Sequence, residues 1–372
     1  MSWAVYLVRM TTGEVGRALD PVSGSWAIEL NKTDSGSVRV KKADLAGLER
    51  DDYTPWKAGV VFCYEPAPDV LIPWCGGPIT GWPSETLREI EFSWSGVRKI
   101  FERRYIETDM ALSGMSLGSI AWEVVQAGMA KPGGALPIVH GTPSENYSPG
   151  HQRTYEKWNL ANNLVDKRLT ELSEVIGGPD MMFRPEWATG DRSKVRWSFV
   201  HGVRVDPSIP QNWVPDWDLT SVSDVEDASV TSSATEIATR VWGTGAGEGA
   251  ATVITKAESM SLVKDYFPFL ESVLSDPDQK NAGPILAKCR AELQGDRRMV
   301  DQLSLTVRAG SEKNPVGSWF VGDDARITLG DEFLTIPRGT RDMRIIKASG
   351  SLDESVELEL QEGQWFTAED AL

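Results

Sequence analysis

The first hundred residues show the alternating hydrophobic and polar pattern of short β-strands separated by turn signals. Residues 3–8 are rich in β-forming side chains, and Val38 and Val40 share one face of a strand predicted at 37–41. Further strands are predicted at 58–64, 70–74, 87–94 and 97–104, with a Ser95-Gly96 turn between the last two. Short strands at this spacing predict a β-barrel or a β-sandwich.

Near residue 109 the pattern changes to helical spacing. Leu117, Ile120 and Val124 predict a helix over 116–129, and a loop rich in proline, glycine and serine follows it. A longer apolar stripe predicts a helix over 154–176, which ends at Gly177-Gly178-Pro179. Strands predicted at 181–184 and 195–200 complete a stretch that we interpret as an α+β domain.

After a polar, acidic stretch, the last third returns to strands with a helical interruption. The predicted elements are a strand at 235–242, helices at 261–274 and 283–293, and strands at 303–308, 318–321, 325–329, 343–347 and 356–360. The sequence therefore predicts a β-rich α+β protein with two β-barrel-like domains and an α+β domain between them. The predicted limits are 1–108 and 221–372 for the barrel-like domains and 109–220 for the α+β domain, with a helical insertion at 256–298.

The 372-residue chain has a net charge of −16, from 54 acidic and 38 basic residues. A surface that binds nucleic acid needs basic groups, so this balance disfavours DNA or RNA as a bound partner. The balance is compatible with a conduit, because three copies would carry −48 (3 × −16) and a negative lumen repels DNA. A part of a virion that is simply kept soluble by its charge would show the same acidity.

The scattered cysteines Cys63, Cys75 and Cys289 disfavour a disulfide framework and fit synthesis in a reducing cytoplasm. A bridge between Cys63 and Cys75 across paired strands is left open. No stretch approaches the roughly 20 apolar residues of a membrane helix, and the first residues lack the basic region of a signal peptide.

A glycine-rich turn at 243–249 is the first candidate for a binding site. Gly245, Gly247 and Ala250 satisfy a loose G-x-G-x-x-A pattern after a predicted strand. A dinucleotide site would need a helix directly after the turn, whereas β-branched residues at 252–255 predict a strand. We therefore expect a flexible hairpin and no bound cofactor.

The histidines His140, His151 and His201 show no metal-ligand spacing, and the first two are predicted at exposed loop positions beside the proline-glycine loop. Asp216 and Asp218 flank Trp217 and could imitate a glycosidase pair, but a solvated acidic loop explains them equally. Asp323-Asp324 lacks the spacing of a calcium loop. Neither a G-x-S-x-G elbow nor a P-loop occurs, so no catalytic, cofactor or metal residue is assigned and no enzymatic activity is expected.

Tryptophan is unusually frequent, with 15 copies. We expect those near predicted strands to cover a neighbouring subunit, because tryptophan is enriched at interface hot spots, although tryptophan also stacks on sugars. The tryptophans in this group are Trp74, Trp82, Trp94, Trp187, Trp197, Trp213, Trp217 and Trp242.

Motifs along most of the chain occur in a recognisable order. They are Ile72-Pro73-Trp74-Cys75-Gly76-Gly77-Pro78-Ile79-Thr80-Gly81, Gly177-Gly178-Pro179-Asp180, Phe183-Arg184-Pro185-Glu186-Trp187, Gly243-Thr244-Gly245-Ala246-Gly247-Glu248-Gly249, Tyr266-Phe267-Pro268-Phe269-Leu270-Glu271, Val316-Gly317-Ser318 and Val321-Gly322-Asp323-Asp324-Ala325-Arg326-Ile327. This order resembles the tail hub or minor tail proteins of long-tailed (siphovirus) actinobacteriophages, which are related to phage baseplate hub proteins.

The resemblance implies a homotrimeric ring at the tail tip of a virion, assembled in the host cytoplasm. Such a ring continues the tail tube, contacts the distal tail protein, the tape measure protein and other tail-tip proteins, and gates the exit of the tape measure and DNA. DNA is then a partner only in transit, and no membrane segment is expected. Two alternatives stay open: a tail-borne cell-wall hydrolase, and a glycan- or receptor-binding tail module.

Overall fold

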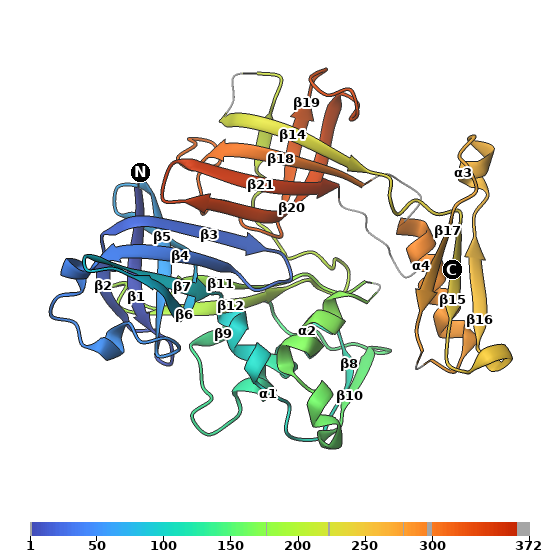
Figure 1. Ribbon diagram of the computed structural model, residues 1–372, viewed down its shortest axis with the longest axis horizontal. Coiled ribbons are helices and arrows are strands. Elements are labelled where there is room, and N and C mark those ends of the chain that lie inside the picture. The colour runs from blue at the N-terminus through green and yellow to red at the C-terminus, as the bar shows by residue number, and fades with distance from the viewer. Residues whose placement is uncertain (1, 176, 222–223, 278, 296–299, 363–372) are drawn as a thin grey trace.

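The computed structural model describes residues 2–175, 177–221, 224–277, 279–295 and 300–362. Strands dominate these residues, and the helices are short (Figure 1). Figure 1 shows strands from the first and last parts of the chain side by side, a region with α1 and α2 next to them, and a small module with α3 and α4 set apart. The protein is therefore β-rich α+β, as the sequence predicts.

The first part of the chain forms β1 (Ser2–Arg9), β2 (Val15–Leu19), β3 (Pro21–Glu29), β4 (Ser35–Lys41), β5 (Ala58–Ala67), β6 (Val70–Glu85) and β7 (Glu89–Ser95), with the 3₁₀ helices η1 (Lys42–Leu45), η2 (Arg50–Asp52) and η3 (Val97–Arg103). The strand predicted at 97–104 is wrong, because these residues form η3. This helix buries Val97 and Phe101 and lets the Arg98 guanidinium reach Asp166, so tertiary contacts override the local β propensity.

The middle part forms β8 (Met110–Met115), α1 (Leu117–Met129), β9 (Ile138–His140), β10 (His151–Tyr155), η4 (Lys157–Asn162), α2 (Val165–Ser173), β11 (Met181–Trp187), β12 (Val195–His201) and β13 (Asp216–Asp218). Helix α1 is confirmed, and the Ser116 hydroxyl caps it by accepting a hydrogen bond from the Ser119 backbone N–H. The helix predicted over 154–176 is wrong in its first half. There the Asn163 side chain donates to the Glu156 carbonyl and separates η4 from α2.

The last part forms β14 (Val225–Ser233), β15 (Arg240–Thr244), η5 (Gly249–Ala251), β16 (Ile254–Glu258), α3 (Ser261–Lys264), β17 (Glu271–Ser275), α4 (Ala282–Gly295), β18 (Val300–Arg308), β19 (Asp324–Leu329), β20 (Gly339–Ser351) and β21 (Ser355–Glu362). The helix predicted at 261–274 is wrong, because α3 is a single turn and the residues after Pro268 form β17, which pairs in parallel with β15. The strand predicted at 318–321 is wrong as well, since these residues form turns.

One continuous sheet runs through the first and last parts. The order of its main path is β14-β18-β21-β20-β3-β4-β7-β6-β5-β1-β2, and β19, which pairs with β13, attaches to β20. Strand β20 joins the two parts by antiparallel pairing with β3, from Lys347 opposite Glu29 to Ser351 opposite Ser25. Among the described strands the path ends at β2 and β14 without closing, so the two predicted barrel-like domains are not confirmed. The domain limits at 108 and 220 and the insertion at 256–298 stay predictions.

Buried tryptophans pack between the first and last parts. Trp26 on β3 lies 5.7 Å from Trp74 on β6, measured between ring centroids, and Trp74 lies 5.1 Å from Trp319. Trp217 on β13 continues the row at 5.9 Å from Trp319. All four rings belong to one hydrophobic core that draws side chains from both parts. The shared core and the β3–β20 pairing therefore join the first and last parts into one unit.

The cysteines are free and buried. Phe62 pairs with Cys75 across β5 and β6, so the Cys63 side chain points to the opposite face of the sheet, and Cys63 and Cys75 belong to different cores. The bridge left open by the sequence is therefore not formed. Within the described residues, no helix has the length and apolar character to cross a membrane.

Candidate assembly surfaces

An ionic cluster lies where the three parts of the chain meet. The Arg344 guanidinium of β20 donates to the Asp180 carboxylate at 2.6 Å and to the Asp324 carboxylate at 2.9 Å. It also donates to the Ser208 hydroxyl at 2.8 Å, and Asp180 accepts a further hydrogen bond from the Asn31 side-chain amide at 2.9 Å. Burial raises the pKa of Asp180, and Arg344 opposes that shift. Because an unpaired buried charge is costly, the cluster favours one arrangement of the parts.

Two further arginines tie the same parts together. Arg184 on β11 donates to the Asp323 carboxylate at 2.9 Å, and its guanidinium lies 4.7 Å from the centroid of the Phe320 ring. Arg98 on η3 donates to the Asp166 carboxylate of α2 at 2.6 Å. Sequence reasoning did not single out any of these arginines. Their available signal is a charged residue next to apolar ones, as at Arg184, which follows Met181-Met182-Phe183.

The two ends of the large sheet present strand edges. Strand β14 pairs along its length with β18 and carries the exposed acidic side chains Glu226 and Asp227. Strand β2 pairs with β1, and among the described residues only its first residue has a backbone partner on the other side, where the Val15 N–H donates to the Ser193 carbonyl at 2.9 Å. The last strand at each end of a sheet is a template for pairing with another chain. These edges are therefore candidates for contacts between copies.

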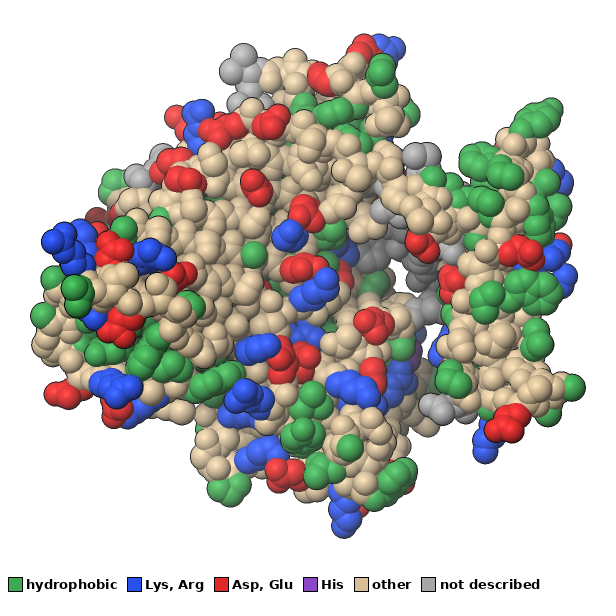
Figure 2. Space-filling model, in the orientation of Figure 1, with side chains coloured by type: hydrophobic (Ala, Val, Ile, Leu, Met, Phe, Trp, Pro, Cys, Tyr) green, Lys and Arg blue, Asp and Glu red, His purple; other side chains and the backbone are tan. Residues whose placement is uncertain are grey.

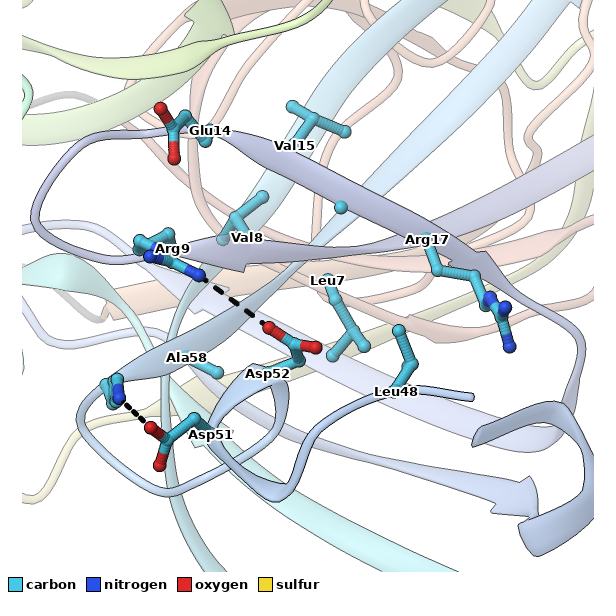
Figure 3. A pocket seen from close by; sticks show the side chains of 12 residues that line it. Leu7, Val8, Arg9, Glu14, Val15, Arg17, Leu48, Asp51, Asp52 and Ala58 are labelled. Carbon is cyan, nitrogen blue, oxygen red and sulfur yellow. Dashed lines mark hydrogen bonds and ion pairs between the residues drawn. The ribbon is translucent and has the colours of Figure 1, made fainter. Parts of the chain in front are cut away.

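A groove of about 220 Å³ lies beside β2, between the β1–β2 hairpin and the loop that contains η2 (Figure 3). Figure 3 shows the Arg9 guanidinium and the Asp52 carboxylate pointing toward one another, at 3.7 Å, with Leu7 and Leu48 nearby. Lys57 forms an ion pair with Asp51. The groove is smaller than a typical small-molecule site, and these charged groups already have partners. It is a recess next to an open strand edge rather than a catalytic cleft.

The glycine-rich turn serves packing. Strands β15 and β16 form the predicted hairpin, which is confirmed. A side-chain carbon added at Gly243 would lie 2.4 Å from Ile285 and 2.5 Å from Cys289, and one added at Gly245 would lie 2.4 Å from Ile285. Both neighbours belong to α4. These glycines therefore let α4 lie close against the sheet, which explains the motif without a phosphate.

The histidines that the structure brings together are His140 and His201, not His140 and His151. Their Nε2 atoms lie 2.9 Å apart, since β9 and β12 are neighbours in a parallel pair. The His201 Nδ1 lies 2.8 Å from the Gly202 carbonyl and donates to it, so the assigned tautomer has the His140 Nε2–H donating to His201. Burial lowers the pKa of His140 to about 4, and that of His201 is also lowered.

His140 therefore departs from the prediction of an exposed loop position. It is half-buried on β9, and its ring stacks on Trp122 with centroids 4.5 Å apart. His151 is exposed, at the start of β10. Within the described residues, no group of three or more histidine, cysteine, aspartate or glutamate side chains is arranged to hold a metal.

The candidate carboxylates are held by structural partners. Asp216 accepts from the Lys313 ammonium at 2.8 Å, and Asp218 accepts from the Thr220 hydroxyl at 2.6 Å, which lowers the pKa of Asp218. Both carboxylates are therefore held by groups of the chain itself, which explains them without a glycosidase pair. Asp323 and Asp324, as described above, accept from buried arginines.

Half of the eight tryptophans expected at a subunit interface lie inside the chain. Trp74, Trp94, Trp197 and Trp217 are buried, which makes the prediction wrong for these four. Trp82, Trp187 and Trp242 are half-buried, and Trp213 is 51% exposed. The sequence could not separate the two roles, because a joint between distant parts of one chain and a joint between two chains use the same aromatic residues.

No protein-family model matches the sequence, and no curated protein matches it. The fold is similar to that of a tail protein from Neisseria meningitidis MC58, with a TM-score of 0.57 and 14% identity over 100% of this chain and 99% of the other. It is also similar to the 43 kDa tail protein of prophage MuSo2 from Shewanella oneidensis, with a TM-score of 0.56 and 11% identity over 96% and 98% of the two chains.

A prophage tail protein from Listeria monocytogenes EGD-e gives a TM-score of 0.51 with 12% identity, over 99% of this chain and 97% of the other. In all three comparisons the match covers nearly the whole of both chains, so the arrangement of all parts is shared and not only one sheet. At these identities the likeness concerns the fold. This chain has the fold of these bacterial and prophage tail proteins.

Proposed function

We propose that this chain is a structural subunit of a bacteriophage tail, located at the tail tip, where copies of it form a ring-shaped hub. The observation that carries the proposal is the full-length fold match to tail proteins of three different bacteria. The ordered motifs of a siphovirus minor tail protein agree with it and suggest an actinobacteriophage as the source. The role is mechanical, and we propose no enzymatic activity.

The ring is proposed to be a homotrimer closed by a head-to-tail contact. Such a contact joins two different surfaces of one chain and closes when the rotation between copies completes a circle. The edges of β2 and β14 are different surfaces of this kind, and strand addition would join them. Their exposed side chains include opposite charges, because Asp227 on β14 is acidic and Arg17 on β2 is basic.

In this role the ring would continue the tail tube and gate the exit of the tape measure and DNA. Its proposed partners are the distal tail protein, the tape measure protein and other tail-tip proteins, and DNA would meet it only in transit. The charge of −16 per chain suits a passage that DNA must not adhere to. The proposed location is the virion, after assembly in the host cytoplasm.

The alternatives have weaker support. A cell-wall hydrolase needs a carboxylate pair or a metal, and the described carboxylate candidates are occupied by structural partners. A glycan-binding module needs exposed aromatic faces near converging polar groups, whereas four of the eight candidate tryptophans are buried. We therefore retain only the structural role.

The proposal is tested by mass photometry of the purified chain, alone and with its neighbouring tail proteins. We expect a species of three times the chain mass. Asp227→Lys, which reverses a charge on the β14 edge, should weaken it at least tenfold, and the matched change Asp331→Lys at another exposed aspartate should not. Stable monomers under every combination of partners would refute the ring, and equal effects of the two variants would refute the β14 contact.

A further inference from the structure

The small module made by β15, β16, β17, α3 and α4 covers only one face of its sheet. On the covered face, Ile285, Cys289 and Leu293 of α4 pack on Val241 of β15 and Ala257 of β16. Side chains alternate along a strand, so the residues between these point to the other face. Among the described residues, the hydrogen bonds and ring contacts of that other face stay within the module, so it presents an uncovered sheet face, which we call the open face.

Four charged side chains at the centre of the open face pair with one another. Arg240 donates to the Glu258 carboxylate at 2.9 Å and to the Glu271 carboxylate at 3.0 Å. The Trp242 indole N–H donates to Glu271 at 2.8 Å, and the Lys256 ammonium donates to Glu258 at 3.1 Å. Two cations and two carboxylates thus neutralise one another. A partner can cover this face without leaving any of these four charges unpaired.

Large apolar side chains surround these charges. Ile254 and Val273 are 61% and 66% exposed, and Phe269, whose ring centroid lies 4.5 Å from the Arg240 guanidinium, is 42% exposed. Tyr266 and Phe267, just after α3, are 98% and 42% exposed. Figure 2 shows hydrophobic side chains spread over the visible surface of this module. Such a concentration on a soluble chain marks an interaction site.

The backbone at Tyr266 adds an independent observation. Its φ is 69°, in the left-handed region, where glycine ordinarily ends a helix. The hydrogen bonds from the Tyr266 N–H to the Val263 carbonyl and from the Phe267 N–H to the Leu262 carbonyl hold this conformation. A bulky residue in this region is strained, and strain of this kind concentrates at functional sites. Here the strained conformation directs a phenol ring into solvent.

Charge balance favours a second copy of this chain over a nucleic acid or a cationic protein. Copies of a chain with a net charge of −16 repel one another, so they can meet closely only where the local charge is balanced. A nucleic acid would need an excess of basic groups, and a cationic protein would need an excess of acidic groups. The open face offers neither, and its tryptophan, tyrosine and arginine are the residue types of interface hot spots.

The size of the open face decides what kind of contact it makes. Three strands about 4.8 Å apart, each with five residues of about 3.3 Å, give a face of about 14 by 17 Å. This area is well below the roughly 800 Å² per partner of a free-standing interface, even with the aromatic residues after α3 added. The open face is therefore suited to a contact that supplements a larger one.

We propose that the open face, from Trp242 and Val273 to Tyr266, docks on a second copy of the same chain and braces the assembly. The inference rests on the proposed function, because the ring supplies the second copy. In the ring the module would reach across to the next subunit, while the large sheets make the main contact.

The test is site-specific photo-crosslinking of the full-length chain in its assembled state, with a photoreactive amino acid at Val273. We expect a crosslinked product of two copies, and none from the same probe at Leu334, which is fully exposed outside the module. An assembly in which Val273 crosslinks only to another tail protein, or to nothing, overturns this inference and leaves the ring intact. A chain that never assembles overturns the proposed ring as well.

The variant Tyr266→Gly separates docking from folding. It removes the exposed ring and relieves the strained backbone, so the melting temperature should stay the same or rise. Crosslinking from Val273 should nevertheless fall at least fivefold. Full crosslinking in this variant would contradict docking through the tyrosine, and loss of both crosslinking and melting temperature would show that Tyr266 supports the fold instead.

Discussion

Trp319→Ala removes the ring at the centre of the tryptophan row that joins the first and last parts of the chain. Trp319 is fully buried, and it packs edge-to-face on Trp74 at 5.1 Å and on Trp217 at 5.9 Å. Its indole N–H donates to the Asn314 carbonyl at 3.1 Å. Replacing a buried tryptophan by alanine typically costs about 3–5 kcal/mol, and the buried carbonyl left without its donor adds about 1 kcal/mol. We expect a loss of about 4–6 kcal/mol.

The loss is measured by urea unfolding, as a shift in the midpoint at constant slope. The matched control is Trp158→Ala, because Trp158 is 76% exposed and its removal should cost no more than about 0.5 kcal/mol. A double-mutant cycle with Trp74→Ala tests the joint itself, since the two rings come from different parts of the chain. We expect a coupling of about 0.5–3 kcal/mol. Strict additivity, or equal losses from Trp319→Ala and Trp158→Ala, would refute a shared core.

Further predictions concern the buried polar groups. Arg344→Met should cost about 3–5 kcal/mol in urea unfolding, because it leaves the Asp180 carboxylate buried without its guanidinium, and adding Asp180→Asn should recover part of the loss. The His140–His201 pair should lower the unfolding free energy as the pH falls from about 6.5 to 4, because the unfolded chain binds protons there that the buried pair does not. His140→Gln should therefore lose less stability over this range than the unmodified chain. Burial raises the pKa of Asp34 from 3.8 to about 7, so this carboxyl removes stability as pH rises through that window. The stability that Asp34→Asn gains over the unmodified chain should therefore be larger at pH 8 than at pH 5. An equal gain at both pH values would contradict a buried Asp34 that ionises in this range.

Local patterns in the sequence predicted the elements whose cause is local. Helix α1 begins at its Ser116 cap, and the glycine turn forms a hairpin because β-branched residues follow it. The pattern misleads where a contact with a distant part of the chain outweighs local propensity. The residues of η3 have the pattern of a strand, but they form a helix in which Arg98 donates to Asp166 of α2. The pairing of β20 with β3 joins residues more than 300 positions apart, and no spacing along the chain encodes it.

The sequence likewise predicted some features of the candidate surfaces and missed others. The sequence placed Tyr266 and Phe267 in a helix and among the ordered motifs, but it could not show that these side chains are exposed or that β15, β16 and β17 leave one face uncovered. It assigned the tryptophans to contacts between subunits, whereas Trp74 and Trp217 make contacts within the chain. Exposure is a property of the folded chain, so residue type alone could not decide between these roles.

The central claim is that copies of this chain encircle the axis at the far end of a phage tail. Cryo-electron microscopy of the intact particle tests it most directly, because the fold can be placed in the map without any assumption about partners. We predict three copies around the tail axis, with the β2 edge of each beside the β14 edge of the next. A particle whose tail end is built entirely from other chains would contradict the claim.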